Sequence, residues 1–433
     1  MTLDTIVALA TPSGRGALAV VRISGPGSRS ILTSVAGRLP SPRVASLRRL
    51  RGADGDILDE ALILWFPGPH SYTGEDVAEF HLHGGTAVVG AVLDRLADLG
   101  ARPAEPGEFT RQAVLNGRMD LTAAESVVDL IDAETAAQAR QALRNLGGAL
   151  ARQCDAWATR LTGLLARAEA AIEFAEDGTP EASEDSGGAA SLAAEIRTQL
   201  AADQGGERIR TGLDIAILGA PNAGKSSLIN ALAGREAAIV SAQPGTTRDV
   251  VEARIVLAGL PITLADTAGL RETVEEIERE GIRRALDRGE AADIVVAVLA
   301  CDAPADDATL ALIARRHCIV VGGKADLAPP PSAWRALPVS VRTGQGLREL
   351  RDRIEAEAQA LTPSAGAALL TRPRHRAALR DTADWLDEAS IAPLPELRAE
   401  ALRAALDALG RLTGRVGAED VLDRLFADFC VGK

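Results

Sequence analysis

The stretch 217–228, ILGAPNAGKSSL, carries residues whose types and spacing can bind phosphate. Gly219, Gly224, Lys225 and Ser226 fill the G-x-x-x-x-G-K-[ST] pattern of a phosphate-binding loop. The glycines let backbone N–H groups approach phosphate oxygens, and the helix that follows adds the positive end of its dipole. We expect Lys225 to reach the β- and γ-phosphates and the Ser226 hydroxyl to bind Mg2+. For this pattern alone, the alternative is a glycine-rich strand–helix turn that binds nothing.

Two further motifs follow at the spacing expected of a nucleotide hydrolase. An apolar strand, ITLA, ends in DTAG (266–269), where an Asp holds the Mg2+ shell and a Gly N–H senses the γ-phosphate. The turn PGTTRD (244–249) lies between the two motifs, and its Thr247 hydroxyl can complete the Mg2+ sphere. An ordinary turn and a helix cap explain each motif singly, but not all of them in this order. The central domain is therefore predicted to hydrolyse a nucleoside triphosphate.

The composition is that of a globular protein without membrane spans. The 433 residues are enough for two to four domains. The longest apolar runs fall far short of the ~20 residues that cross a bilayer, and the N-terminus shows no secretory signal. The four cysteines, at 154, 301, 318 and 430, have no spacing typical of zinc or disulfides, so we expect a cytoplasmic protein.

The net charge of −13 argues against a surface that coats nucleic acid generally. The densest basic clusters, 48–51 and 372–376, are either solvated faces or local RNA contacts.

The order of apolar and polar residues predicts a multidomain α/β protein. Residues 1–116 alternate strands and turns, as in an α+β domain, and 208–361 alternate strands and helices, as in a Ras-like doubly wound sheet. Residues 117–207 and 362–433 have helical periodicity, with a loop expected over 176–188. The nucleotide domain is thus predicted to be inserted into one helical bundle. Two separate helical domains, or helices docked on the nucleotide domain, are the alternatives.

Two opposite charges fall inside strands of the N-terminal domain. Arg22 lies in VVRIS and Glu79 in VAEFHLH. Each can face solvent, or the two can line one polar pocket.

With these motifs in order, the chain resembles the MnmE (TrmE) family of tRNA-modifying GTPases. The resemblance covers almost the whole length, and its most specific stretches are ATPSGRGALAVVRISG, WFPGPHSYTGEDV, LNGRMDLTAAE, GAPNAGKSSLINAL, AAIVSAQPGTTRD, DTAGLRET and the terminal FCVGK.

The resemblance implies a homodimer formed through the N-terminal domain, which binds a one-carbon tetrahydrofolate, 5-formyl- or methylene-tetrahydrofolate. It implies a partner, the FAD- and NADH-dependent protein MnmG (GidA), in a heterotetramer or larger assembly. Together they attach an aminomethyl-type group, carboxymethylaminomethyl, to carbon 5 of the wobble uridine of certain tRNAs. The family's folate positions match Arg22, Glu79, Arg118 and Lys433.

The resemblance also assigns the GTP site. Its residues match Asn222, Ala223, Gly224, Lys225, Ser226, Ser227, Ser241, Gln243, Gly245, Thr246, Thr247, Asp266, Thr267, Ala268, Gly269, Gly323, Lys324, Asp326, Ser340, Val341 and Arg342.

Hydrolysis in the family uses a K+ ion where Ras-type enzymes use an arginine. Leu270 follows DTAG, so the water-orienting Gln of Ras-type GTPases is missing. The resemblance implies a K+ site made by the Asn222 side chain and the backbone carbonyls of Ser241, Gln243 and Thr246. It assigns the catalytic acid that orients water to Glu278, although Glu275, Glu276 and Glu280 are close by.

Two positions differ from the family's pattern, and a third has two possible roles. The guanine-reading motif N-K-x-D has Gly323 in place of Asn, so we expect weaker guanine affinity than is usual in the family and tighter binding on Gly323→Asn. Arg118 stands where the family usually has Lys, which keeps the charge and changes its geometry. Cys430 is either a reactive residue or a small packing residue.

Two other functions remain open from the residues alone. A regulatory GTPase switch would bind a protein or a ribosome without modification chemistry, but such GTPases lack the N-terminal module and the C-x-G-K tail. A scaffold with a degenerate nucleotide site is opposed by the intact Lys225, Ser226, Thr247 and Asp266.

Overall fold

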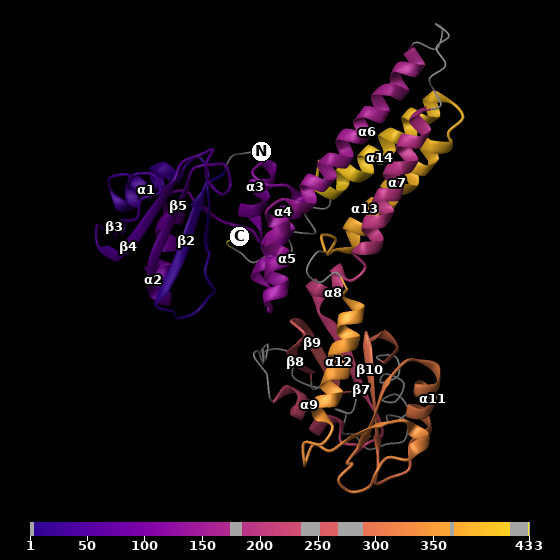
Figure 1. The fold of residues 1–433 in the computed structure, drawn as a ribbon. Helices are drawn as coiled ribbons and strands as arrows, with labels where there is room; N and C mark the ends of the chain where they lie inside the picture. Colours follow the sequence, from indigo (N-terminus) through magenta and orange to yellow (C-terminus); the bar gives the residue numbers. More distant parts are fainter. Residues whose placement is uncertain are drawn as a thin grey trace, which may run out of the picture. The chain divides into compact units, whose positions relative to one another are not determined.

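A computed structural model of the chain describes residues 4–173, 184–234, 252–266, 289–363, 368–415 and 432 (Figure 1). Contacts between residues divide the chain into two compact units. The first unit comprises Met1–Val128, Asn145–Ala190 and Asp384–Lys433, and the second comprises Asp129–Arg144 and Ser191–Ala383. Each unit is therefore assembled from segments that are far apart in the sequence.

The first unit contains a six-stranded sheet in the order β3-β4-β5-β2-β1-β6. Its strands pair antiparallel except for β1 and β6, which are parallel. The strands are β1 (Ile6–Leu9), β2 (Leu18–Ser24), β3 (Ser46–Arg51), β4 (Ile57–Phe66), β5 (Val77–His83) and β6 (Arg102–Pro103). The expected α+β arrangement is confirmed.

Period-two alternation sends the apolar residues of these strands to one face, where helices α1 (Ser28–Ala36) and α2 (Thr86–Asp98) cover them. Val21, Ile63 and Phe80 are fully buried there. The opposite face is covered near β1 by helix α3 (Glu108–Leu115), whose Phe109 packs with Ile6, Ala8 and Tyr72.

Helices from both sides of the nucleotide domain pack together in the first unit. Helix α6 (Ala149–Glu173) lies against α14 (Pro395–Thr413), and ion pairs join Glu169 to Arg403 at 2.8 Å and Asp155 to Arg415 at 2.7 Å. Of the other helices, α4 (Leu121–Ile131) lies mostly in the first unit and α5 (Ala136–Leu146) mostly in the second, while α7 (Glu184–Ala202) and α13 (Pro373–Ile391) are each divided between the two units. The prediction that the two helical segments form one bundle is confirmed for α6 and α14.

The predicted loop over 176–188 is wrong at its C-terminal end, because α7 begins at Glu184. Gly187 and Gly188 suggest a loop, since glycine disfavours helix by about 1 kcal/mol relative to alanine. In the fold, Gly188 lies so close to Leu164 of α6 that a Cβ would sit 2.8 Å from its Cδ2. Close helix packing at a residue without a side chain overrides the local propensity.

The second unit contains the predicted mostly parallel sheet, in the order β12-β11-β10-β7-β9-β8, with only β8 antiparallel to its neighbour. Its strands are β7 (Leu213–Leu218), β8 (Glu252–Leu257), β9 (Leu260–Asp266), β10 (Ile294–Ala300), β11 (Ile319–Gly323) and β12 (Leu337–Val339). Every residue of β10 is buried, as expected for a strand covered on both faces.

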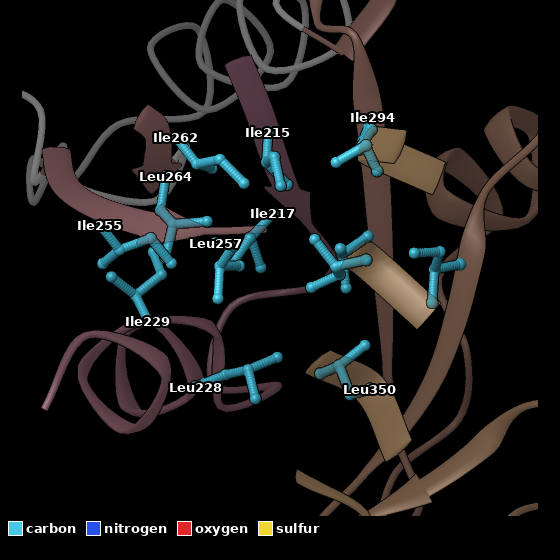
Figure 2. Close-up of a cluster of buried hydrophobic side chains, with 14 of the residues drawn as sticks. Ile215, Ile217, Leu228, Ile229, Ile255, Leu257, Ile262, Leu264, Ile294 and Leu350 are labelled. Atoms are coloured by element: carbon cyan, nitrogen blue, oxygen red, sulfur yellow. The ribbon is translucent and has the colours of Figure 1, made fainter. Parts of the chain in front are cut away.

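Helices cover both faces of this sheet. On one face, α9 (Lys225–Ala233) and α12 (Leu347–Leu361) contribute Leu228, Ile229 and Leu350 to a core that includes Ile215 and Ile217 (Figure 2). On the other face, α11 (Asp307–Arg315) packs against the alternate residues of β7 and β10. The doubly wound architecture is confirmed, and it places the turn after β7 at the carboxyl edge of the sheet.

The segments that lead into and out of the nucleotide domain are tied to each other within the second unit. Asp203, which is 3% exposed, accepts hydrogen bonds from the backbone N–H groups of Leu369 and Leu370 at 3.0 and 3.1 Å. The Arg210 side chain, at the end of α8 (Gly206–Thr211), donates to the carbonyl of Thr371 at 3.0 Å. This adjacency is what an inserted domain requires.

Candidate functional site

The loop between β7 and α9 has the close backbone packing that a phosphate-binding loop needs. Gly219 follows β7 directly with a φ of 154°, and a Cβ there would overlap the carbonyl oxygen of Val298 in β10. Only glycine fits this position. The loop therefore starts against the central strand of the sheet, and its other end is the first turn of α9, a helix whose N-terminal dipole favours anions.

Lys225 lies inside this loop. Its side chain is 4% exposed, and its Nζ donates to the carbonyl oxygens of Gly219 and Ala220, both at 2.8 Å. Its ammonium is thus held within the loop that the sequence assigns to the phosphates. Asn222, with a φ of 63°, and Ser226 are exposed on the same loop, which leaves an amide and a hydroxyl where K+ and Mg2+ ligands are expected.

A cavity of about 310 Å3 adjoins the loop, a volume at the lower end of the range for small-molecule sites. The phosphate loop, β10, β11, β12 and the turns after β11 and β12 surround it. Its residues include Ala223, Gly224, Ser227, Gly323, Lys324, Asp326, Val341 and Arg342, all of which the sequence assigns to GTP.

Asp326 is the only carboxylate among the residues that line this cavity. Its Oδ1 accepts a hydrogen bond from the buried Ser340 hydroxyl at 2.7 Å, and Arg342 lies 3.8 Å from its Oδ2. The hydrogen bond from Ser340, together with the nearby Arg342 charge, lowers the pKa of the Asp326 carboxyl. A fixed, ionised carboxylate can accept both N–H groups on the N1 and N2 edge of guanine.

In the first unit, Arg22 and Glu79 form the shared polar site that the sequence leaves open. They are directly opposite each other on β2 and β5, and Arg22 Nε and Nη2 donate to Glu79 Oε1 at 3.0 and 2.8 Å. Both side chains are about four-fifths buried. The guanidinium also lies 5.5 Å from the Tyr72 ring and 5.7 Å from the Phe109 ring.

Arg118 and Gly432, the described neighbour of Lys433 in the sequence, contact segments next to this pair. Arg118 donates from Nε to the carbonyl of Ser71 at 3.3 Å, beside the loop that carries Tyr72. Gly432, the neighbour of Lys433 in the sequence, packs on Leu9 and Ala10 next to Ala8, the strand partner of Arg22. A side chain at Gly432 would overlap the Leu9 carbonyl.

Comparison with known protein families matches the N-terminal domain and the rest of the chain to two family models. Residues 5–118 match the N-terminus of the GTP-binding protein TrmE, and residues 121–430 match the MnmE helical domain. A tRNA modification GTPase MnmE of Granulibacter bethesdensis is 51% identical over 100% of both chains. The corresponding protein of Gluconacetobacter diazotrophicus is 52% identical over 99% of this chain and 98% of its own length.

The chain belongs to the MnmE (TrmE) family.

Among solved structures, the G domain of the T. maritima FeoB iron transporter aligns with 34% of this chain and 99% of its own, at 27% identity and a TM-score of 0.26.

Several of the assigned residues lie outside the part of the chain that the structure describes: Ser241, Gln243, Gly245, Thr246, Thr247, Thr267, Ala268, Gly269, Glu278, Cys430 and Lys433. For Asp266 only the backbone is placed. It ends β9 opposite Ile217 of β7, two residues before Gly219. The register of parallel strands thus brings the backbone of Asp266, the first residue of DTAG, to the edge that carries the phosphate loop.

Sequence reasoning missed the groups around the Arg22–Glu79 pair. Tyr72 is the only tyrosine of the chain, and its hydroxyl is 2.8 Å from Thr110 Oγ1. Burial raises the pKa of Tyr72, so its hydroxyl stays neutral. His81 lies 3.5 Å from the second oxygen of Glu79. Glu79 and His81 alternate on β5 and so point to the same face of the sheet, which is the signal that could have found His81. No local pattern indicates the aromatic contacts.

No helix within the described ranges is long and apolar enough to cross a membrane.

Proposed function

We propose that this chain is a K+-activated GTPase that acts in tRNA modification. With an FAD-dependent partner of the MnmG (GidA) type, it installs an aminomethyl-type group on carbon 5 of the wobble uridine, using a one-carbon tetrahydrofolate. Two observations support this proposal. The chain is about half identical to MnmE proteins over its full length. It also contains a nucleotide-sized cavity beside the phosphate loop and a separate polar site in the N-terminal domain. A place in the cytoplasm, where tRNA is modified, follows from this role.

The nucleotide site divides the work of hydrolysis among its own residues. Lys225 holds the β- and γ-phosphates, Ser226 and Thr247 bind Mg2+, and Asp326 reads the base. A K+ ion beside Asn222, completed by carbonyls of Ser241, Gln243 and Thr246, would neutralise the charge that develops on the transferred phosphoryl group. Glu278 orients the attacking water. The K+ site is completed when two nucleotide domains of a homodimer meet.

Exchange of K+ for Na+ is expected to lower GTP turnover by on the order of 10², the usual effect of losing one charge-stabilising group. Na+ is smaller than K+ and would fit less well a site formed by Asn222 and the three carbonyls. Steady-state phosphate release in matched KCl and NaCl buffers measures the effect, and GDP affinity in both buffers is the control. Equal turnover in the two salts would remove K+ from the mechanism.

Glu278→Ala is expected to leave GTP affinity near normal and to reduce turnover by roughly 10²–10³, because the water is no longer oriented. Glu275→Ala and Glu280→Ala are the matched controls on the same acidic stretch. Single-turnover hydrolysis of bound GTP distinguishes the three. Normal hydrolysis by the Glu278 variant would assign the role to another group.

The folate site is proposed around Arg22 and Glu79. A carboxylate accepts two N–H groups from the amide-like edge of a pterin, and cations such as Arg118 and Lys433 hold the glutamate tail. The rings of Tyr72 and Phe109 add apolar walls beside the pair. Arg22 balances the negative charge of Glu79, and its two hydrogen bonds to Glu79 Oε1 hold the carboxylate in place.

Gly432→Ala is expected to weaken tetrahydrofolate binding about 10-fold or more, since strain at a positive φ costs about 1–3 kcal/mol. Its φ is 101°, and the new methyl group would overlap the Leu9 carbonyl, so the tail could not dock. Lys433→Gln, which removes the charge without blocking the tail, is the comparison. Calorimetric titration with 5-formyltetrahydrofolate measures both variants. GDP binding should be unchanged, and unaltered folate affinity in both variants would exclude the tail from the site.

The decisive test of the whole function is nucleoside analysis of tRNA from cells with and without this gene. The carboxymethylaminomethyl group on the wobble uridine is expected to disappear in the deletion strain and to return with the intact gene. Unchanged wobble uridine in a deletion strain would favour a GTPase switch without modification chemistry.

A further inference from the structure

At Gly323, the base-binding turn comes close to the backbone of the phosphate loop. A Cβ at Gly323 would lie 2.9 Å from the carbonyl oxygen of Ala223 and 3.1 Å from Val298 Cγ1. A Cβ at the preceding Gly322 would lie 2.7 Å from Pro330 Cβ. These contacts bring β11 and the phosphate loop together at a point where the N-K-x-D motif uses an asparagine side chain.

The polar side chains that line the cavity besides Asp326 are Ser227, Lys324 and Arg342, and none of them carries an amide. The Lys324 ammonium donates to Asp302 at 3.0 Å, and Arg342 lies beside Asp326. The one hydroxyl among the lining residues, on Ser227, belongs to the first turn of α9 next to Lys225 and Ser226. The other lining side chains are apolar: Ala223, Leu228, Val298, Val321, Leu327, Val339 and Val341.

We infer that this site recognises guanine through its N1 and N2 edge alone and makes no side-chain hydrogen bond to N7. Asp326 accepts from N1–H and N2–H. The missing asparagine amide is the group that would face the opposite edge, and its second task, joining the two loops, is done by the packing of Gly323 on Ala223. The inference relies on the proposed function for the identity of the base as guanine.

The discriminating ligand is 7-deazaguanosine diphosphate, in which a C–H replaces N7 and the N1 and N2 edge is unchanged. The full-length protein is expected to bind it and GDP with dissociation constants that agree within about twofold, since no hydrogen bond is lost. Gly323→Asn is expected to prefer GDP by about fivefold, the effect of one net hydrogen bond. Gly323→Ala is the matched control, because it introduces the same Cβ without the amide.

The two variants also separate two effects on absolute affinity. Gly323→Ala measures the cost of moving the Ala223 carbonyl away from a Cβ. GDP binding by Gly323→Asn relative to Gly323→Ala measures the gain from the amide. The tightening over the wild type that the sequence predicts for Gly323→Asn requires this gain to exceed that cost.

Titration calorimetry with both diphosphates gives each result directly. A wild-type protein that binds GDP but loses fivefold or more with the 7-deaza analogue would overturn the inference. A Gly323→Asn variant that binds GDP yet shows no more discrimination than Gly323→Ala would overturn it as well. Failure of the wild-type protein to bind any guanine nucleotide would instead overturn the proposed function.

Discussion

Lys225→Ala is expected to reduce GTP turnover by on the order of 10²–10³, because a buried, preorganised cation at the phosphates is lost. Lys225 is 4% exposed, and its Nζ lies 2.8 Å from two loop carbonyls, which fix the ammonium within the phosphate loop. Removing the ammonium also takes away its hydrogen bonds to the Gly219 and Ala220 carbonyls, of which the Ala220 carbonyl keeps the Ala223 N–H at 3.2 Å. Phosphate release under saturating GTP, with thermal unfolding to check the fold, measures the loss.

Lys225→Arg is the matched control and is expected to restore little of the activity. Its charge is the same, but a planar guanidinium cannot occupy a position shaped for a compact ammonium. The use of lysine in this chain also indicates that an ammonium is required at this position. Of 47 basic residues, only three are lysines, Lys225, Lys324 and Lys433, and each stands in a motif of the family. Wild-type turnover by the alanine variant would show that the phosphates bind elsewhere.

Asp326→Asn is expected to weaken GDP binding by roughly 10² or more, because a site built to accept N–H groups leaves them unpaired when its acceptor changes. An amide offers one donor and one acceptor, so the variant should gain affinity for xanthosine diphosphate, which carries an oxygen at C2. Competition of both diphosphates with a fluorescent analogue measures the exchange. Retention of tight GDP binding without any gain for xanthosine diphosphate would exclude Asp326 from base recognition.

Ser340→Ala is the control for the position of that carboxylate. It removes the 2.7 Å hydrogen bond but keeps the acceptor, so its effect on GDP affinity should be smaller than that of Asp326→Asn.

The hydrogen bond from Ser340 to Asp326 also predicts how GDP affinity changes with pH. Because the pKa of Asp326 is lowered from its ordinary value of 3.8, the wild-type carboxylate stays ionised as pH falls from 8 to 5. Affinity attributable to Asp326 is therefore expected to be constant over this range. It should decline only in stronger acid, at a higher pH in Ser340→Ala than in the wild type.

The sheet of the nucleotide domain was predictable because its strands are short apolar runs between turn residues. The stretch DIVVAVL becomes β10, which is buried along its whole length, and LDIAIL becomes β7, which leads into the phosphate loop. The start of α7 was not predictable, since Gly187 and Gly188 have the propensity of a loop. The contact of Gly188 with Leu164, two dozen residues earlier, decides that they are helical.

At the candidate nucleotide and folate sites, too, some features were predictable from the sequence and others only from the fold. By itself, the sequence predicted which residues could bind phosphate, Mg2+ and guanine, because G-x-x-x-x-G-K-S and K-x-D set local backbone and side-chain chemistry that needs no distant partner. Only the tertiary structure decided that Arg22 and Glu79 share one site rather than two solvent faces, because strand register, not spacing, makes them neighbours across 57 residues. It also decided that Gly323 lies so close to the phosphate loop that a Cβ there would be 2.9 Å from the Ala223 carbonyl oxygen, a consequence of the packing of β11 beside β10.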